Sequence, residues 1–290
     1  MRTIGIDLAW GRRNTTAAVA LERENGTGDF VVVAEAEALT DDDSILDFVR
    51  RADTGGGLLL GIDAPLDVPN ETGERPVEAL LRRCFGRYQA GAHPANRRLY
   101  GGDIRGERLA LRLAAEFGIS NDFEFPVGDP AVRRCLEVFP HPAQVVLFEL
   151  TRTLKYKARS GRDLSSRHAE FGRLVAGLRG LSRQSPSLRA PNWLELPTAG
   201  LRGMALKRYE DRLDALVCAY VAAYFWQWGE SDRCTVIGDR KTGYVVTPIT
   251  PALRACLEGH TSVGSEGFAG RGDALVSAST ILRGGSDENE

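Results

Sequence analysis

An apolar strand that ends in an aspartate occurs twice in this chain and constrains its fold more than any other feature. The first copy spans residues 2–10. Its period of two puts Ile4, Ile6 and Leu8 on one face and Gly5, Asp7 and Ala9 on the other. The second copy, residues 58–65, repeats the Gly-Ile-Asp tripeptide at Asp63, and Pro65 ends it. A buried carboxylate is costly unless a cation compensates it, so we expect Asp7 and Asp63 to meet at one acidic site.

The composition indicates a folded chain with reduced thiols. At 290 residues, with 43% hydrophobic and 26% charged residues, the chain can bury a large core as one elaborated domain. The longest apolar run, residues 215–229, is too short to span a bilayer, so we expect a buried helix there and no membrane segment. A strand begins at residue 2, which leaves no room for a signal peptide. The five cysteines follow no zinc or disulfide spacing, which favours free thiols and a cytoplasmic protein. The oligomeric state stays open, with a homodimer as one option.

Charge is distributed unevenly along the chain. Residues 22–53 are rich in acids, whereas residues 82–112 and 152–189 are rich in Arg and Lys. Such polarity suits a phosphate-rich partner that faces one side of the molecule. An alternative is a general preference for Arg, since the sequence contains few Lys.

The hydrophobic pattern predicts an α/β fold with a mixed five-stranded sheet. Strands over residues 15–23 and 30–38 follow the first strand as an antiparallel meander. A helix over 41–51, capped by Thr40 or Asp41, returns the chain to strand 58–63, which the right-handed crossover places parallel to the first. With a fifth strand over 132–138, the predicted strand order is 3-2-1-4-5, with strand 2 antiparallel. Helices flank this sheet.

The remaining segments are predicted to decorate that sheet in a single domain, residues 1–258. An Arg-rich helical insertion at about 66–130 contains helices 76–86 and 105–117, and its loop 88–103 is predicted to act as a lid. Further helices are expected over 165–181 and 207–228, and a closing hairpin over 235–247. Residues 259–290 are predicted to be a flexible tail.

Five carboxylates are candidates for one catalytic site: Asp7, Asp63, Glu137, Asp211 and Asp214. Asp211 and Asp214 stand three residues apart on one face of the last long helix. Clustered carboxylates repel unless cations neutralise them, and hard oxygen ligands suit Mg²⁺ or Mn²⁺. Two such ions about 4 Å apart would clamp a phosphodiester for attack by water.

Each acid also has a simpler interpretation. Asp63 could cap a turn, Asp211 could pair with Lys207, and Glu137 could pair with Arg133 or Arg134. His141 is a weak candidate for a general base. The basic segment around Lys155 and Lys157 could contact phosphate or could be a solvated loop.

The order of these motifs resembles the ribonuclease H-like fold, near its Holliday-junction resolvase branch. There, acids on the first strand, the fourth strand and the last helix bind two divalent ions, which implies metal ligation by Asp7, Asp63, Asp211 and Asp214. Five motifs resemble, more closely, an uncharacterised family of predicted RNase H-like nucleases, domain of unknown function 429, over roughly residues 1–250. They are Gly5-Ile-Asp-Leu-Ala-Trp10, Gly61-Ile-Asp-Ala-Pro65, Glu137-Val-Phe-Pro-His-Pro142, Lys155-Tyr-Lys157 and Asp211-Arg-Leu-Asp-Ala-Leu-Val-Cys-Ala219. The chain departs from the resolvases in having Asp in place of Glu on the fourth strand, and in its Arg-rich insertion.

The leading hypothesis is a Mg²⁺- or Mn²⁺-dependent nuclease that hydrolyses phosphodiester bonds of DNA or RNA. Substrate contacts are assigned to Lys155, Lys157, Arg97, Arg98 and Trp10. One alternative is an ATP-using phosphotransferase of the sugar-kinase and actin type, although no second Asp-x-Gly loop or Gly-rich adenosine motif occurs. Another is a non-catalytic module that binds nucleic acid or protein.

Overall fold

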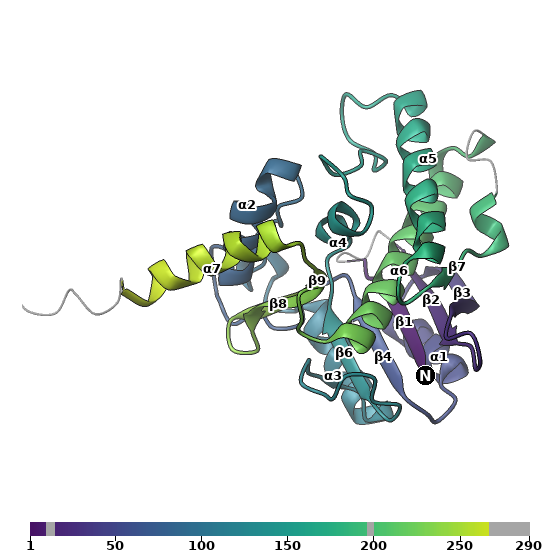
Figure 1. The fold of residues 1–290 in the computed structure, drawn as a ribbon, viewed down its shortest axis with the longest axis horizontal. Coiled ribbons are helices and arrows are strands. Elements are labelled where there is room, and N and C mark those ends of the chain that lie inside the picture. The colour runs from purple at the N-terminus through teal and green to yellow at the C-terminus, as the bar shows by residue number, and fades with distance from the viewer. Residues whose placement is uncertain (10–14, 196–199, 267–290) are drawn as a thin grey trace, which may run out of the picture.

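A seven-stranded mixed sheet forms the centre of the protein (Figure 1). The structure is a computed structural model that describes residues 1–9, 15–195 and 200–266. The strands are β1 (Arg2–Asp7), β2 (Thr16–Arg23), β3 (Phe30–Leu39), β4 (Leu58–Ile62), β5 (Ser120–Asn121), β6 (Arg133–Glu137) and β7 (Leu188–Arg189). Their order across the sheet is β5-β6-β4-β1-β2-β3-β7.

The predicted five-strand order lies inside this larger sheet. β2 is antiparallel to both β1 and β3, and β1, β4 and β6 run parallel to one another. The predicted total of five strands is wrong because β5 and β7 add one short strand at each edge. A strand of two residues has no hydrophobic period, so the sequence carried no signal for either.

Helices cover both faces of the sheet (Figure 1). They are α1 (Asp42–Ala52), α2 (Pro76–Phe85), α3 (Arg105–Phe117), α4 (Pro140–Leu147), α5 (Leu164–Gly180), α6 (Gly203–Trp228) and α7 (Pro251–Glu266), with short 3-10 helices η1 (Gly86–Tyr88), η2 (Arg98–Tyr100), η3 (Leu181–Arg183) and η4 (Asn192–Glu195). The predicted cap of α1 is Asp41, whose side chain accepts a hydrogen bond from the Ser44 amide. α1 and α3 share one core with the sheet, and α5 and α6 share the other.

The alternation of β1 divides these two cores as predicted. Ile4 and Ile6 pack with α1 and α3, whereas Gly5 faces α6. A Cβ atom on Gly5 would lie 1.9 Å from the Ala215 carbonyl oxygen, and one on Gly61 would lie 2.4 Å from the Cys218 carbonyl oxygen. Both Gly-Ile-Asp glycines are therefore required by the close approach of α6 to the sheet.

Two helices differ from the sequence expectation. α4 begins at Pro140, in a segment for which the sequence predicts no helix. Proline is well suited to the first position of a helix. α7 extends to Glu266, so residues 259–266, which the sequence places in a flexible tail, are part of this helix. The rest of that tail, residues 267–290, lies outside the described residues.

A second, two-stranded sheet packs beside the main one. It consists of β8 (Cys234–Asp239) and β9 (Gly243–Pro248), the predicted hairpin, and shares a small core with α2 and α7. Cys84 of α2 and Cys256 of α7 form a disulfide, which corrects the expectation that all five thiols are free. The two cysteines are 172 residues apart, and sequence spacing does not show that α2 and α7 pack together. Among the helices that the structure describes, none is long and apolar enough to cross a membrane.

Candidate functional site

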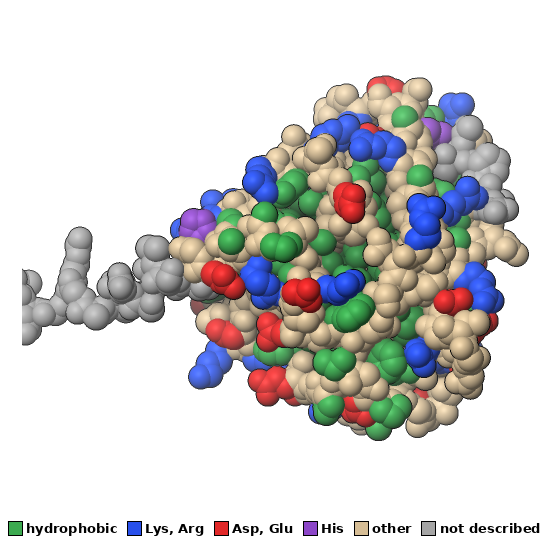
Figure 2. Space-filling model, viewed as in Figure 1, with side chains coloured by type: hydrophobic (Ala, Val, Ile, Leu, Met, Phe, Trp, Pro, Cys, Tyr) green, Lys and Arg blue, Asp and Glu red, His purple; other side chains and the backbone are tan. Residues whose placement is uncertain are grey.

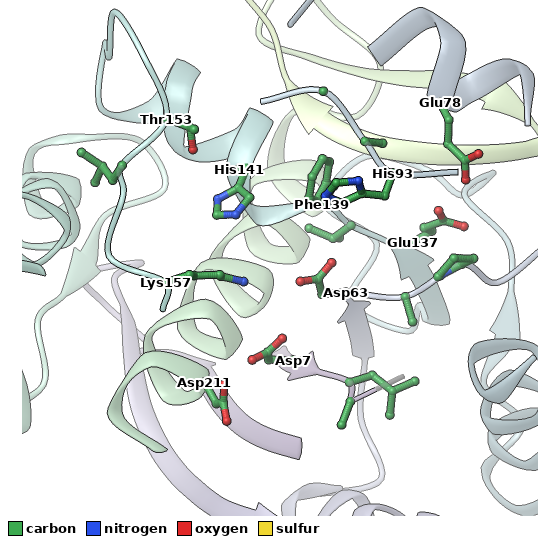
Figure 3. Close-up of a pocket in the computed structure, with 18 of the residues that line it drawn as sticks. Asp7, Asp63, Glu78, His93, Glu137, Phe139, His141, Thr153, Lys157 and Asp211 are labelled. Carbon is green, nitrogen blue, oxygen red and sulfur yellow. The ribbon is translucent and has the colours of Figure 1, made fainter. Parts of the chain in front are cut away.

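A cavity of about 520 Å³ opens where β1 and β4 end beside α6. Asp7 is the last residue of β1, and Asp63 directly follows β4. Because these strands are parallel and in register, the Asp63 amide donates to the Ile6 carbonyl at 2.9 Å, which places the two aspartates side by side. Asp211 of α6 completes the acidic wall (Figure 3). Four of the five predicted acids line this cavity: Asp7, Asp63, Glu137 and Asp211.

All four of these carboxylates hold protons more tightly than usual. Burial raises the pKa of Asp63 to about 7, against the opposing effect of Lys157. Burial also raises the pKa of Asp7 well above its ordinary value, with neighbouring carboxylates adding to the shift. The pKa values of Asp211 and Glu137 rise for the same first reason.

Asp214 is held beneath the cavity rather than at its surface. It is fully buried, and its Oδ1 accepts from the Tyr156 hydroxyl at 2.6 Å and from Gln144 Nε2 at 3.4 Å. Its Oδ2 lies 2.8 Å from Lys157 Nζ. Burial alone would raise the pKa of Asp214, but Lys157 and its other partners lower it below the usual value.

Two lysines bring positive charge into the acidic cluster. Lys157 extends from its loop toward Asp7 and Asp63 (Figure 3). Burial lowers the pKa of Lys157, but Asp214 and the other acids outweigh this and raise it well above the ordinary value. Lys207 Nζ lies 2.6 Å from Asp211 Oδ1 and 2.7 Å from Glu210 Oε1, so the predicted pair with Asp211 is present.

Glu137 is neutralised inside the protein. Arg75 donates to both of its oxygens, at 2.9 and 2.6 Å, and the Leu66 amide donates at 2.8 Å. Arg75 also binds Glu78 at 2.8 Å. The alternative that Glu137 pairs with an arginine is thus correct in kind, but the expected partners are wrong. Arg133 pairs with Asp53 at 2.6 Å, and Arg134 lies 3.8 Å from Asp122.

His141 also lines the cavity. Burial, aided by the charge of Lys157, lowers its pKa to about 3. The imidazole is therefore neutral near pH 7 and a weak base, which makes it a hydrogen-bonding group rather than a strong proton acceptor.

The predicted substrate contacts fall into three groups. Lys155 and Lys157 line the cavity, together with Arg159 and Arg162, which were not proposed. Arg97 and Arg98 instead border a separate hollow. Trp10 lies outside the described residues. The loop predicted as a lid contributes residues 89–93 to the cavity wall, of which all but Ala90 line it.

Three arginines of the first Arg-rich segment pair with the acidic segment. Arg105 and Arg108 of α3 bind Asp42 of α1 at 2.8 and 3.0 Å, and Arg112 binds Asp43 at 2.7 Å. On the face in Figure 2, basic and acidic side chains are accordingly interspersed. Three arginines of α3 therefore join this helix to α1, and the cavity receives its positive rim from residues 155–162.

Several residues that shape the site were not identified from the sequence. They are Arg75, Glu78, Gln144, Arg159 and Arg162, and Tyr156 was noted only as the spacer between two lysines. The Lys-Tyr-Lys motif could have suggested that Tyr156 is buried, because in an extended segment its side chain points to the opposite face from those of the two lysines. Arg75 has a local signal in Glu78, three residues along the chain, but its other partner, Glu137, is 62 residues away and could not be identified from the sequence.

The donor set fits a hard divalent ion only in part. Within the described residues, no three carboxylates of the cavity bring their oxygens within 4.8 Å of one another. The group that meets this condition is Cys84, Cys256 and His260, and its two cysteines are joined as a disulfide. Mg²⁺ commonly uses one or two carboxylates and keeps several waters, so Asp7 with Asp63 or Asp211 suits it.

Comparison with known proteins identifies a family for the chain but no individual relative. A family model described as "Protein of unknown function (DUF429)" matches residues 5–241. No curated protein and no solved structure matches the chain.

Proposed function

We propose that this chain, which belongs to the DUF429 family, is a divalent-metal-dependent nuclease built on a ribonuclease H-like fold. One observation carries the proposal. Three carboxylates from two strand ends and a helix, Asp7, Asp63 and Asp211, line one cavity whose burial raises their pKa values. Carboxylates crowded in this way are stabilised by a cation, and perturbed pKa values in a cavity are typical of functional sites.

The topology supports the ribonuclease H-like part of the proposal. Within the sheet, β3-β2-β1-β4-β6 has the expected order, with β2 antiparallel to its neighbours. The late helix α6 crosses β1 and β4 and carries Asp211 to their carboxyl ends. Ligand sites of α/β sheets occur at such ends.

The residues divide the work of hydrolysis between them. Asp7, with Asp63 or Asp211, would hold the ion, and Lys155, Arg159 and Arg162 at the rim would bind phosphates of the strand. When bound, the ion would lower the pKa of a water and polarise a phosphate oxygen. The water oxygen then bonds to phosphorus, the bond from phosphorus to the leaving sugar oxygen breaks, and solvent accepts one proton and returns another. No side-chain nucleophile is required.

The test is a cleavage assay on single-stranded, duplex and branched DNA and RNA with Mg²⁺, Mn²⁺ or EDTA. We expect metal-dependent cleavage by the wild type and a rate lower by at least about 100-fold in Asp7→Asn, because the central carboxylate is lost. Asp47→Asn, an exposed aspartate of α1, is the matched control and should cleave at the wild-type rate. Intact substrates in every condition, with no metal-dependent rise in Tm, would overturn the proposal.

A non-catalytic nucleic-acid-binding protein is the second candidate. Lys157 and Lys207 favour it, since they already neutralise part of the acidic cluster without any metal. In that case the protein would bind nucleic acid equally well in EDTA, and Asp7→Asn would leave binding unchanged.

A further inference from the structure

We infer that Lys157 is the second cation of the acidic site, so that the cavity holds one divalent ion rather than two. The inference deepens the proposed function and rests on it. It departs from the two-ion arrangement that the sequence suggests, and it assigns Lys157 a role inside the site in addition to the rim contact first expected of it.

The position of Lys157 supports this role. Its ammonium lies 2.8 Å from Asp214 Oδ2, and Figure 3 shows the side chain reaching toward the carboxylates of Asp7 and Asp63. The side chain lines the cavity while its head contacts a fully buried acid. An ammonium in this position provides the positive charge that the second metal ion would provide.

The remaining contacts of Asp214 leave it no role as a metal ligand. Its Oδ1 is engaged by Tyr156 and Gln144, its Oδ2 by Lys157, and it does not border the cavity. Glu137 is likewise engaged by Arg75 through both oxygens. We therefore assign the ion to the other predicted acids of the cavity, Asp7, Asp63 and Asp211, of which Asp211 also binds Lys207 at 2.6 Å.

The number of available ligands also fits one ion. Mg²⁺ binds through one or two carboxylates and keeps several waters. Asp7 with Asp63 or Asp211 provides one such pair in the cavity.

The experiment counts Mn²⁺ ions bound to the folded protein without substrate, by calorimetric titration and by the electron paramagnetic resonance signal of free Mn²⁺. We expect one ion per wild-type chain and two per Lys157→Met chain, because the variant exposes Asp214 to a second ion. Lys155→Met is the matched control, a neighbouring lysine of the same cavity wall, and should keep one ion. Lys157→Arg should also keep one.

Each result decides the matter. Two ions in the wild type, or one ion in folded Lys157→Met, would overturn the inference and leave the nuclease proposal standing. No Mn²⁺ binding by the wild type would overturn both. If Lys157→Met does not fold because Asp214 is left as an unpaired buried charge, Lys157→Gln replaces it, since its amide can donate to Asp214 without carrying a charge. Two ions there support the inference, and one ion overturns it.

Discussion

At the scale of single residues, identical side chains acquire opposite properties from their neighbours. Asp63 is half-buried in the cavity wall, whereas Asp214 of the same cluster is fully buried. The pKa of Asp63 rises to about 7 because burial outweighs the effect of Lys157. The pKa of Asp214 falls because Lys157 and the Tyr156 hydroxyl contact its oxygens directly. The contacts of Lys157 and Tyr156 with Asp214 thus outweigh the effect of burial on its pKa, whereas at Asp63 the effect of burial is the larger one.

This difference predicts a stability that depends on pH in the absence of metal. Between the unfolded pKa of about 3.9 and the folded pKa of about 7, Asp63 binds a proton on folding, so the free energy of unfolding falls as pH rises. The stabilisation from proton binding by Asp63 is complete below about pH 4 and is lost above about pH 7. Its loss lowers the free energy of unfolding by at most about 4 kcal/mol. Urea unfolding in EDTA at pH 5, 6, 7 and 8 measures it. Asp63→Asn should show a shallower decline, and identical pH profiles for the two proteins would contradict the assignment.

At the scale of elements, the contact between α6 and the sheet organises the site. Glycines 5 and 61 let the helix backbone lie directly on β1 and β4. This approach brings Asp211 to the strand ends, next to Asp7 and Asp63. The Gly-Ile-Asp tripeptide thus combines a packing requirement with a carboxylate, which explains why the two residues occur together in both strands.

We expect Gly5→Ala to be strongly destabilising. Its Cβ would lie 1.9 Å from the Ala215 oxygen and 2.2 Å from the Ala219 nitrogen, both backbone atoms that cannot rotate away. The helix must then move, and overpacking of this kind costs about 1–3 kcal/mol or more. Gly56→Ala, whose Cβ would meet nothing within 4 Å, is the control and should change stability by less than about 0.5 kcal/mol. Equal urea midpoints for the two variants would show that α6 does not press on β1 as described.

At the scale of the whole molecule, the Cys84–Cys256 disulfide joins α7, the last described helix, to α2, whose cysteine lies 172 residues earlier in the chain. α7 packs on α2, and Arg75 and Glu78, at the start of α2, line the cavity. The crosslink therefore restrains the wall of the site through an element that lies outside the main sheet. The disulfide is unusual for the cytoplasmic location that the sequence predicts, because persistent disulfides are uncommon in reducing compartments.

We expect the double variant Cys84→Ser/Cys256→Ser to lose about 2–4 kcal/mol of unfolding free energy under non-reducing conditions. The crosslink closes a loop of 172 residues, so its removal gives the unfolded chain more freedom. Under a dithiol reductant the variant and the wild type should be equally stable. Thiol titration of denatured, unreduced wild type should find three free cysteines, those at positions 135, 218 and 234. Five reactive thiols would contradict the disulfide.

The sequence alone determined the central part of the fold and brought two strand-end acids to the candidate site. The period of two in β1, the apolar run of β4, the meander of β2 and β3, and the right-handed crossover are local or handed properties, so the order of five strands follows from them. The repeated Gly-Ile-Asp tripeptide identified Asp7 and Asp63 as strand-end acids. Neither edge strand of two residues, nor the helix that begins at Pro140, carried a pattern long enough to be recognised.

Only the tertiary structure decided which of the predicted acids are bound by donors from distant segments. Glu137 is neutralised by Arg75, 62 residues away, and Asp214 is bound by Tyr156, 58 residues away. The disulfide and the pairing of α1 with α3 likewise join distant segments. Periodicity reports which face of an element is buried, because it depends on neighbours in sequence. A carboxylate's charge depends on donors within about 3 Å in space, and those are set by how the elements pack.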